Sequence, residues 1–262
     1  MPDDRTDPRL TFSRSADRYL ISADHQSGSD LDVIRQMASL QSPSLTVDVA
    51  TGAGHALAAA GPFSKFCVAV DLTMEMLQVT REHLFGAGLE NVRFIQSAAD
   101  HLPLANSTAS LLLCRIAPHH FASIPGFLDE VVRVLEPEGR CVIIDSIVPE
   151  EADKDRFINE IERLRDPSHM RSHTLRQWLK LFEKTGLQTI SVELFERTHP
   201  FQEWAKRTGL DEVGIRAVEE RFQQASLDIQ EKFKVQLDDE GKVDSYTDEK
   251  GIFLLKKVNS EA

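Results

Sequence analysis

The 262-residue sequence has little of several features that define large classes of protein. Its three cysteines, Cys67, Cys114 and Cys141, are too few and too dispersed for a disulfide framework or a zinc site. Each lies in an apolar run, which predicts a small buried side chain. Basic residues are also scarce: 30 Lys and Arg stand against 42 Asp and Glu, for a net charge of −12. An acidic chain without a local basic patch repels nucleic acid and anionic lipid, so we expect neither as a partner.

Long apolar runs are missing as well. The first residues, MPDDRTDPRL, contain no apolar stretch of the signal-peptide type, and no run approaches the roughly 18 apolar residues of a membrane span. We therefore expect a cytoplasmic protein with no membrane span. The hydrophobic fraction of 41% is ordinary for a globular chain, and the length fits one large domain or two small ones.

Short apolar runs and helical segments alternate between about residues 30 and 190. The runs are rich in β-branched residues, as expected of parallel strands that are buried on both faces. The predicted strands are 45–50, 65–71, 91–96, 109–114 and 140–145, and the predicted helices between them are 54–61, 73–87 and 124–136. This alternation predicts right-handed βαβ units and hence an open, doubly wound α/β sheet.

The two ends of the chain differ from this alternating body. Residues 1–44 are polar and predict two helical pieces. Beyond residue 150 the pattern predicts charged helices at 150–180, a strand at 187–195, helices at 200–237, a polar turn or hairpin at 238–251 and a last strand at 251–258. The amphipathic part of this region, 211–237, is a candidate homodimer interface.

A glycine-containing turn follows the first predicted strand. In VDVATGAGH, Gly52 and Gly54 precede a helix, where glycine permits a positive φ and the helix N-terminus offers free N–H groups. Asp71 ends the next strand, nineteen residues after Gly52, where a carboxylate accepts both ribose hydroxyls of a nucleoside. The third glycine of a dinucleotide fingerprint is missing, since Ala56 or Leu57 stands in its place. A nucleoside ligand is therefore favoured over a pyrophosphate.

Five stretches in order carry a family resemblance: VDVATGAGH, VAVDLTMEML, SAADHLPL, SLLLCRIAPHHF and FLDEVVRVLEPEGR. In order and spacing they resemble the motifs of class I S-adenosylmethionine-dependent methyltransferases, most closely the small-molecule group related to ubiquinone/menaquinone biosynthesis. The resemblance spans roughly residues 15–210. It implies that S-adenosyl-L-methionine donates a methyl group to an O, N or C atom of a small-molecule acceptor, by direct SN2-like transfer.

The resemblance also implies an architecture. We expect a Rossmann-like sheet of about seven strands, mostly parallel with an antiparallel last strand, plus a helical N-terminal lid and cap insertions. The expected organisation is one methyltransferase domain over 1–262. Within it, 1–44 form the lid, 45–149 the cofactor-binding core, and 150–262 the substrate-side cap helices and last strands.

The same resemblance assigns roles in cofactor binding. It places Asp48 under the methionine amino group, Gly52 and Gly54 beneath the methionine and ribose, and Asp71 on the ribose hydroxyls. Ala98 stands where family members often carry an Asp that accepts the adenine amino group, so backbone groups or Asp100 would take that contact. The full predicted set is Asp48, Ala50, Gly52, Gly54, Asp71, Leu72, Met76, Ala98, Ala99, Asp100 and Arg115.

The segment CRIAPHHF, after the fourth predicted strand, supplies two candidate catalytic residues, His119 and His120. Histidine is suited to take a proton from an acceptor near neutral pH. Neighbouring residues of an extended segment point to opposite sides, so we expect only one of the two to face the substrate, and favour His120. Methyl transfer does not always need a base, because an in-line nucleophile beside an activated sulfonium supplies much of the acceleration. The alternative is that one histidine bonds nearby backbone and the other packs on the cofactor.

Residues for the acceptor are predicted in two further segments. RDPSHMR holds four chargeable groups, Arg165, Asp166, His169 and Arg171, and a comparable segment occurs in part of the resembling family. The alternative is a capped turn held by an Arg–Asp pair. In the N-terminal arm, Tyr19 and His25 are candidates for a lid that excludes water from the reaction. No metal is expected, since none of the histidines has the spacing of a metal site.

Two other classes of function share parts of this pattern. A nicotinamide-dependent oxidoreductase would use the same strand, turn and terminal acid, but the third glycine and a Tyr-x-x-x-Lys pair are missing. A non-catalytic nucleoside-binding protein of the same fold is the other alternative. Methylation of nucleic acid is disfavoured, because the sequence has neither a (D/N/S)PP(Y/F) tetrad nor a Pro-Cys nucleophile.

Overall fold

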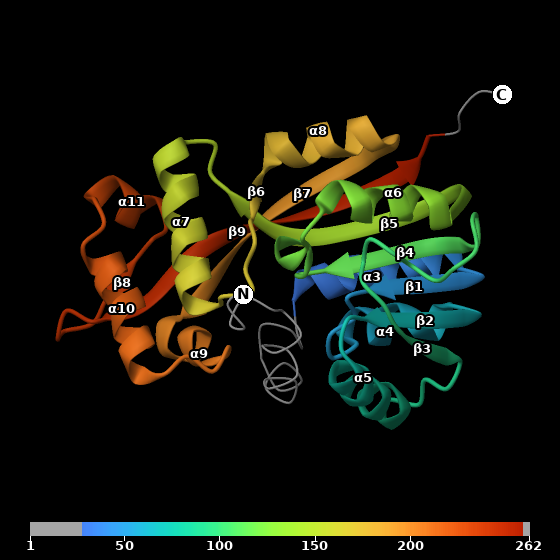
Figure 1. Cartoon of the computed structure of the whole chain (residues 1–262), viewed down its shortest axis with the longest axis horizontal. Coiled ribbons are helices and arrows are strands. Elements are labelled where there is room, and N and C mark those ends of the chain that lie inside the picture. The colour runs from blue at the N-terminus through green and yellow to red at the C-terminus, as the bar shows by residue number, and fades with distance from the viewer. Residues whose placement is uncertain (1–27, 259–262) are drawn as a thin grey trace, which may run out of the picture.

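A computed structural model describes residues 28–258, and its main feature is one sheet with the strand order β3-β2-β1-β4-β5-β9-β7 (Figure 1). The first five strands in this order pair in parallel, whereas β9 runs antiparallel to both β5 and β7. The strands are β1 (Leu45–Val49), β2 (Phe66–Asp71), β3 (Val92–Gln96), β4 (Ala109–Arg115), β5 (Leu135–Val148), β7 (Leu187–Pro200) and β9 (Val243–Lys257), with two short additions, β6 (His173–Thr174) and β8 (Gln236–Leu237). The predicted mostly parallel α/β sheet of about seven strands, with an antiparallel last strand, is confirmed.

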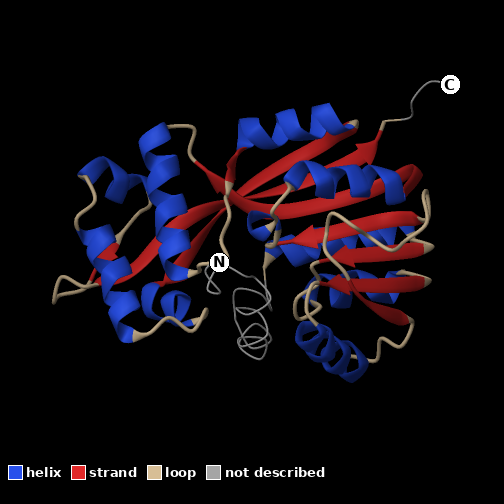
Figure 2. Cartoon of the chain, in the orientation of Figure 1, coloured by secondary structure: helices blue, strands red, loops and turns tan. Residues whose placement is uncertain are grey.

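Helices cover both faces of this sheet (Figure 2). They are α3 (Ser29–Gln41), α4 (His55–Ala60), α5 (Met74–Gly86), α6 (Ile124–Val134), α7 (Ala152–Arg165), α8 (Leu175–Thr185), α9 (Phe201–Lys206), α10 (Glu212–Gln223) and α11 (Leu227–Lys232), with 3₁₀ turns at η2 (Gly61–Phe63) and η3 (Pro118–His120). Between residues 28 and 258, none of them has the length and apolarity that a bilayer crossing requires.

The central strands are apolar at successive positions because both of their faces are buried. In β4, Leu112 and Cys114 belong to the core beneath α6 and α8, whereas Leu111 and Leu113 belong to the core beneath α3 and α4. Cys67 and Cys141 are likewise buried in strands, and all three thiols are free. The prediction of small buried cysteines is confirmed, and burial raises the pKa of each thiol.

A second apolar core lies away from the parallel strands. Figure 1 shows α7, α9, α10 and α11 gathered around the far ends of β7 and β9. Aromatic side chains fill this core, with Trp204 packed edge-on against Tyr246 at 4.8 Å between ring centroids. Because α7 and α9 are held there, Glu162 and Arg165 of α7 and Trp204 of α9 lie on the wall of a cavity with Ser146 of β5.

Several predicted boundaries are wrong beyond residue 150. The stretch 238–251, predicted as a turn, turns only near its start, because β9 pairs along its length with β7 and β5. The predicted helical region 200–237 is three short helices and the two-residue β8, so 211–237 is not one continuous helix. The charged helices predicted at 150–180, by contrast, are observed as α7 and α8, and Asp166-Pro167 ends the first of them. The predicted homodimer stays a prediction.

Only part of the prediction for residues 1–44 can be compared with the structure. Residues 1–27 lie outside the described part of the chain, so the lid, with Tyr19 and His25, stays a prediction, as does the single domain over 1–262. The remainder of 1–44 holds α3, whose Leu31 and Ile34 pack into the core on one face of the sheet. That helix therefore covers the sheet, and its Asp30 bonds Arg115, which lines the candidate site.

Candidate functional site

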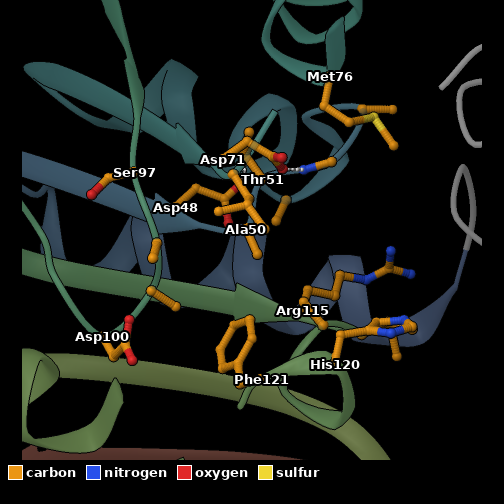
Figure 3. A pocket seen from close by; sticks show the side chains of 18 of the residues that line it. Asp48, Ala50, Thr51, Asp71, Met76, Ser97, Asp100, Arg115, His120 and Phe121 are labelled. Carbon is orange, nitrogen blue, oxygen red and sulfur yellow. Dashed lines mark hydrogen bonds between the residues drawn. The ribbon is translucent and has the colours of Figure 1, made fainter. Parts of the chain in front are cut away.

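The larger of two neighbouring cavities opens at the carboxyl ends of the parallel strands, where ligands bind in open α/β sheets. Its volume is about 290 Å³. It is lined by Asp48, Ala50, Thr51, Gly52, Ala53, His55, Ala56, Asp71, Leu72, Met76, Ser97, Ala98, Ala99, Asp100, Arg115, Ile116, Ala117, His120, Phe121, Ala122 and Ser123. Figure 3 shows the carboxylates of Asp48 and Asp71 near the ends of their strands, with Phe121 and His120 on another wall.

Asp48 lies at the floor of this cavity, near the end of β1. Its carboxylate is buried and accepts a hydrogen bond of 2.6 Å from the Thr51 hydroxyl. Burial raises the pKa of Asp48 to about 7; nearby Asp71 raises it further, while the Thr51 bond and Arg115 act in the opposite direction. A carboxylate poised near neutrality in a cavity is a candidate for pairing with a cationic ligand group.

The loop after β1 has an unusual backbone. Ala50 and Gly52 both have φ of +54°, in the left-handed region that favours glycine. A Cβ placed on Gly52 would have no atom within 4 Å, so this glycine faces open space inside the cavity wall. The backbone at Gly52 therefore leaves room for a ligand to approach closely.

Asp71 ties this loop to the next strand. One carboxylate oxygen accepts from the Gly52 backbone N–H at 3.0 Å, and the other accepts from the Thr73 N–H at 3.1 Å. Burial raises the pKa of Asp71 against the effect of these bonds. Oδ1 also accepts from the Thr73 hydroxyl at 3.4 Å, so Oδ2, with one bond, keeps a lone pair for a ligand hydroxyl.

The structure brings most of the predicted cofactor residues together, but Gly54 is an exception. Gly54 does not line the cavity; it has φ of +83° at the start of α4. A Cβ there would come within 2.8 Å of the Thr80 methyl group. The close packing of α4 against α5 therefore explains why position 54 is a glycine, and room for a ligand does not.

The other walls differ in polarity. Leu72 and Met76 form an apolar side, and Ala98, Ala99 and Asp100 form the loop after β3. Arg115 reaches the cavity from the end of β4 while its Nε donates to buried Asp30 of α3 at 2.5 Å. Among residues 28–258, three carboxylates and one guanidinium therefore line this cavity.

The two candidate catalytic histidines lie in the 3₁₀ turn η3, so the expectation that they belong to an extended segment is wrong. Their ring centroids are 4.2 Å apart, but the two rings have different neighbours. His119 Nδ1 bonds Asp145 Oδ1 at 2.5 Å and lines only the smaller cavity. His120 lines both cavities, and its Nδ1 lies 3.1 Å from the Ser168 backbone oxygen.

The two histidines differ in their electrostatic surroundings: His120 is kept neutral, and His119 is paired with the Asp145 carboxylate. Burial, together with neighbouring His119, lowers the pKa of His120 to about 4. Burial opposes ionisation of Asp145, but adjacent His119 and the more distant Lys250 outweigh it and hold its pKa below the usual range. Asp145 is therefore an ionised carboxylate that accepts the Nδ1 hydrogen of His119.

The smaller cavity, of about 60 Å³, shares Ile116 and His120 with the larger one. Its lining comprises Ile116, His119, His120, Ser146, Glu162, Arg165, His169, Ser172, Arg197, His199, Trp204, Arg207 and Lys250. Ile116 has φ of +52°, which is rare for a β-branched residue. Backbone strain of this kind collects at functional sites, and here it lies at the boundary of the two cavities.

The residues of the RDPSHMR segment divide between the two predicted roles, acceptor binding and a capped turn. Arg165 and His169 line the smaller cavity, and His169 Nε2 donates to Asn159 at 3.0 Å. Burial and nearby His119 lower the pKa of His169 to about 3. Asp166 instead caps a turn, accepting from the Ser168 hydroxyl at 2.6 Å. Arg171 pairs with Asp155 at 2.6 Å, with its side chain 40% exposed, away from both cavities.

Sequence reasoning missed several lining residues. Lys250, His199 and Ser146 carry no motif; they meet only because β9 pairs with β5 on one side and β7 on the other. Lys250 and Asp248 are buried in a stretch whose polarity predicts a turn. Asp248 and Lys250 stand two residues apart, which is the spacing of one face of a strand and is a sequence signal for β9. Over residues 28–258, no three His, Cys, Asp or Glu side chains are arranged to hold a metal ion.

Comparison with known proteins identifies relatives. Residues 47–143 match the family model described as a methyltransferase domain. A Bacillus subtilis (strain 168) protein named as an uncharacterized methyltransferase, YcgJ, is 31% identical over 235 residues, which are 90% of this chain and 93% of the relative. A ubiquinone/menaquinone biosynthesis C-methyltransferase of Syntrophotalea carbinolica is 31% identical over 55% of this chain and 62% of its own. A solved protein of Bacillus halodurans C-125 is 33% identical, with a TM-score of 0.85 over 88% of this chain and 100% of the other.

Proposed function

The chain belongs to the class I S-adenosylmethionine-dependent methyltransferases, and from that premise we propose that its larger cavity binds S-adenosyl-L-methionine and its smaller cavity a small-molecule methyl acceptor. Bound there, the cofactor supplies an electrophilic methyl group on a sulfonium centre. The observation that carries the proposal is the arrangement of Asp48, Gly52 and Asp71 around one cavity at the strand ends.

The residues of the larger cavity fit this cofactor. Gly52 presents backbone to open space, and buried Asp48 offers a negative charge for the methionine ammonium group. Asp71 Oδ2 accepts one backbone hydrogen bond and keeps a lone pair for a ribose hydroxyl, while Oδ1 accepts from both the backbone and the hydroxyl of Thr73. The described part of the lining has three carboxylates and one guanidinium, and these carboxylates complement a ligand that carries a sulfonium and an ammonium.

The adenine of the cofactor would lie beside the loop after β3. Leu72 and Met76 supply apolar surface for the ring, and the backbone groups of Ala98 and Ala99 are available for its polar edge. Asp100 lines the same wall and offers a carboxylate to the adenine amino group. The absence of an Asp at position 98 is thus compensated within the same loop.

Transfer would occur where the two cavities meet, at His120 and Ile116. His119 is the better placed general base, because Asp145 accepts its Nδ1 hydrogen, so that Nε2 is the nitrogen left to take a proton. His120, whose pKa is lowered to about 4, stays neutral and orients the acceptor from the boundary. This division favours an acceptor whose attacking oxygen or nitrogen loses a proton.

Binding and turnover test this function separately. Isothermal titration with S-adenosylhomocysteine should give a dissociation constant on the order of micromolar. Incubation with methyl-labelled cofactor and a metabolite extract should move label into a small molecule. Absence of binding at millimolar ligand would overturn the proposal, whereas binding without any transfer would favour the non-catalytic nucleoside-binding alternative. Reduction of a nicotinamide cofactor by the same extract would favour the oxidoreductase.

A further inference from the structure

We propose that the Nδ1 lone pair of His169 recognises a hydroxyl or amino hydrogen of the methyl acceptor, and that Asn159 is the residue that positions this lone pair. The inference rests on the proposed function, since it names the chemistry that the acceptor offers to the smaller cavity. His169 lines that cavity, whereas Asn159, buried on α7, lines neither cavity. His169 is a predicted acceptor residue, and Asn159 belongs to no motif.

Backbone groups fix the orientation of the Asn159 amide. Its Oδ1 accepts from the Ser172 backbone N–H at 2.8 Å. Its Nδ2 donates to the backbone oxygens of Asp155 at 3.1 Å and of Ser172 at 3.3 Å, and to the Asp155 carboxylate at 2.7 Å. A backbone N–H only donates and a carbonyl only accepts, so a flipped amide would lose every one of these bonds.

The amide in turn fixes the hydrogen of the imidazole. His169 Nε2 lies 3.0 Å from Asn159 Oδ1, and because this oxygen is an acceptor, Nε2 carries the hydrogen. Burial, together with neighbouring His119, lowers the pKa of His169 to about 3, so the ring is neutral near pH 7. A neutral imidazole with its hydrogen on Nε2 has its lone pair on Nδ1.

The second nitrogen of this ring lies at the cavity surface. Within residues 28–258, Nδ1 of His169 accepts no hydrogen bond, yet it is not enclosed by protein atoms as Nδ1 of His173 is. His169 reaches no other cavity of the described chain than the smaller one. The lone pair is therefore presented to the space in which the proposed acceptor binds.

Backbone bonds hold this ring beside the proposed general base. The N–H groups of Met170 and Arg171 both donate to the backbone oxygen of His119, at 2.9 and 3.1 Å, and so join the loop after α7 to η3. The ring centroids of His119 and His169 are 5.4 Å apart. If His119 takes the hydrogen that the attacking atom loses, the hydrogen on His169 is one that the acceptor retains. The acceptor then has at least two polar hydrogens, on one amino group or on two neighbouring groups.

An atom that can only accept discriminates more sharply than the hydroxyls in the same wall. The hydroxyls of Ser146 and Ser172 can each donate or accept, so they fit a ligand oxygen of either kind. His169 Nδ1 has no hydrogen to give. An ether oxygen or a carbonyl in front of it would set two lone pairs against each other, and sites of this kind reject a ligand that lacks the expected hydrogen.

The first measurement is the tautomer of His169. Two-bond ¹H–¹⁵N NMR separates a ring nitrogen that carries hydrogen from one that carries a lone pair, and we expect the hydrogen on Nε2 in the wild type. Asn159→Asp keeps an oxygen acceptor there, so the tautomer should persist while the added negative charge raises the pKa of His169. Asn159→Leu removes the acceptor and should spread the hydrogen over both nitrogens. A wild-type hydrogen on Nδ1 would overturn the inference, and an unmoved His169 pKa in Asn159→Asp would remove Asn159 as the positioning residue.

The second measurement uses two pairs of probes that match in size but differ in donor hydrogens. Acetamide is paired with acetone, and ethylene glycol with 1,2-difluoroethane. We expect acetamide or ethylene glycol to shift the Nδ1 signal of His169 saturably, half complete on the order of 10 mM, and the partner without donor hydrogens to give no such shift. The tighter donor shows whether the cavity prefers an amino or a hydroxyl hydrogen. No saturable shift with either donor up to about 100 mM would contradict the recognition.

Two substitutions of His169 separate its two nitrogens. His169→Gln can still donate to Asn159 but has no acceptor in the place of Nδ1, whereas His169→Asn puts an amide oxygen near that place. With the indole N–H of Trp204 in the cavity wall as reporter and that of Trp178 as reference, the tighter donor should bind roughly ten-fold or more weakly to His169→Gln. His169→Asn should bind it within a few-fold of wild type, as should the exposed control His101→Gln. Equal losses in the two His169 variants would overturn the inference.

Failure of this inference is distinguishable from failure of the proposed function. If S-adenosylhomocysteine binds and neither donor probe reaches His169, the methyltransferase proposal stands and His169 has only a structural role. If a donor probe saturates His169 but S-adenosylhomocysteine does not bind, the recognition site stands and the proposed cofactor site falls.

Discussion

Asp145, near the carboxyl end of β5, accepts the Nδ1 hydrogen of His119 at 2.5 Å. The carboxylate is fully buried and the imidazole nearly so, on the wall of the smaller cavity. An ionised partner on Nδ1 fixes the tautomer and leaves the lone pair on Nε2. The pair thus has the arrangement of an oriented general base, and neither His119 nor Asp145 lines the larger cavity.

Replacing Asp145 by Asn should disable this base and leave cofactor binding intact. The amide either donates to Nδ1, which reverses the tautomer, or accepts weakly, and proton removal is worth roughly 100-fold to 10,000-fold in rate. We expect methyl transfer to fall by at least about 100-fold. Nitrogen-15 NMR of the His119 ring should show the altered tautomer, and titration should show S-adenosylhomocysteine binding within a few-fold of wild type.

The matched control for that experiment is Asp248→Asn. Asp248 pairs with His199 at 3.1 Å in the same region, so it should alter the His199 ring signals and leave those of His119 in place. If Asp145→Asn left both the His119 tautomer and the transfer rate unchanged, His119 would not be the base.

Replacing Asp71 by Ala should weaken S-adenosylhomocysteine binding strongly. The variant removes a charged hydrogen bond to ribose, worth about 1.5–3 kcal/mol, and it also releases the Gly52 N–H that Asp71 now holds at 3.0 Å. Isothermal titration should show a loss of roughly ten-fold or more, at about 1.4 kcal/mol per ten-fold. Asp129→Ala, on the exposed side of α6, is the control. Equal affinity in the two variants would remove Asp71 from the site.

Cofactor affinity should depend on pH through Asp48. Burial raises its pKa to about 7, so at pH 6 the free protein carries a proton there that a ligand ammonium must displace. Affinity for S-adenosylhomocysteine should therefore rise between about pH 6 and 8, with close to one proton released at the acidic end. Titrations in buffers of different ionisation enthalpy measure that proton, and Asp48→Asn should bind weakly with a flat pH dependence. A flat profile in the wild type would place the ligand ammonium elsewhere.

The parallel strands and the larger cavity could be predicted because they depend on short patterns in the sequence. Continuous apolarity predicts the strands at 45–50, 65–71 and 109–114. Gly52 follows the first of these strands and Asp71 ends the second, and because the strands are parallel their carboxyl ends meet at one edge of the sheet. The acceptor side could not be predicted in the same way. Lys250 and Arg207 are about 43 residues apart in sequence, and only the pairing of β9 with β7 brings their regions together.

Two errors in the prediction have the same physical origin. Residues near Lys250 look like a solvated turn because their side chains are polar, yet those side chains are buried in ion pairs such as Lys250–Asp248 at 2.7 Å. Gly54 looks like part of a ligand cradle because it follows Gly52, yet its neighbour is Thr80 of α5. Composition does not say whether a polar group or a missing side chain serves a ligand or the protein's own packing.

Acid should destabilise the protein through His169. Its pKa is about 3 in the folded chain and near 6.5 when unfolded, so the unfolded state binds more protons between these values and stability falls as pH drops below about 6.5. From pH 7 to 5 this residue alone should cost about 2 kcal/mol of unfolding free energy. Urea unfolding of His169→Gln should show a smaller loss over that interval than wild type, while exposed His101→Gln should match wild type. Identical losses in all three proteins would contradict the neutral, buried state of His169.

Replacing Gly54 by Ala should destabilise the fold more than the same change at another left-handed glycine. Gly54 has φ of +83°, and an alanine methyl would meet the Thr80 methyl group at 2.8 Å. Gly88 has φ of +79° with nothing within 4 Å, so Gly88→Ala carries the backbone cost alone, about 1–2 kcal/mol. Overpacking at Gly54 should add roughly 1–3 kcal/mol to that cost, measured as the difference between the two variants in urea unfolding. Equal destabilisation would mean that α4 and α5 separate without strain, and a loss of cofactor binding without a loss of stability would return Gly54 to the ligand cradle.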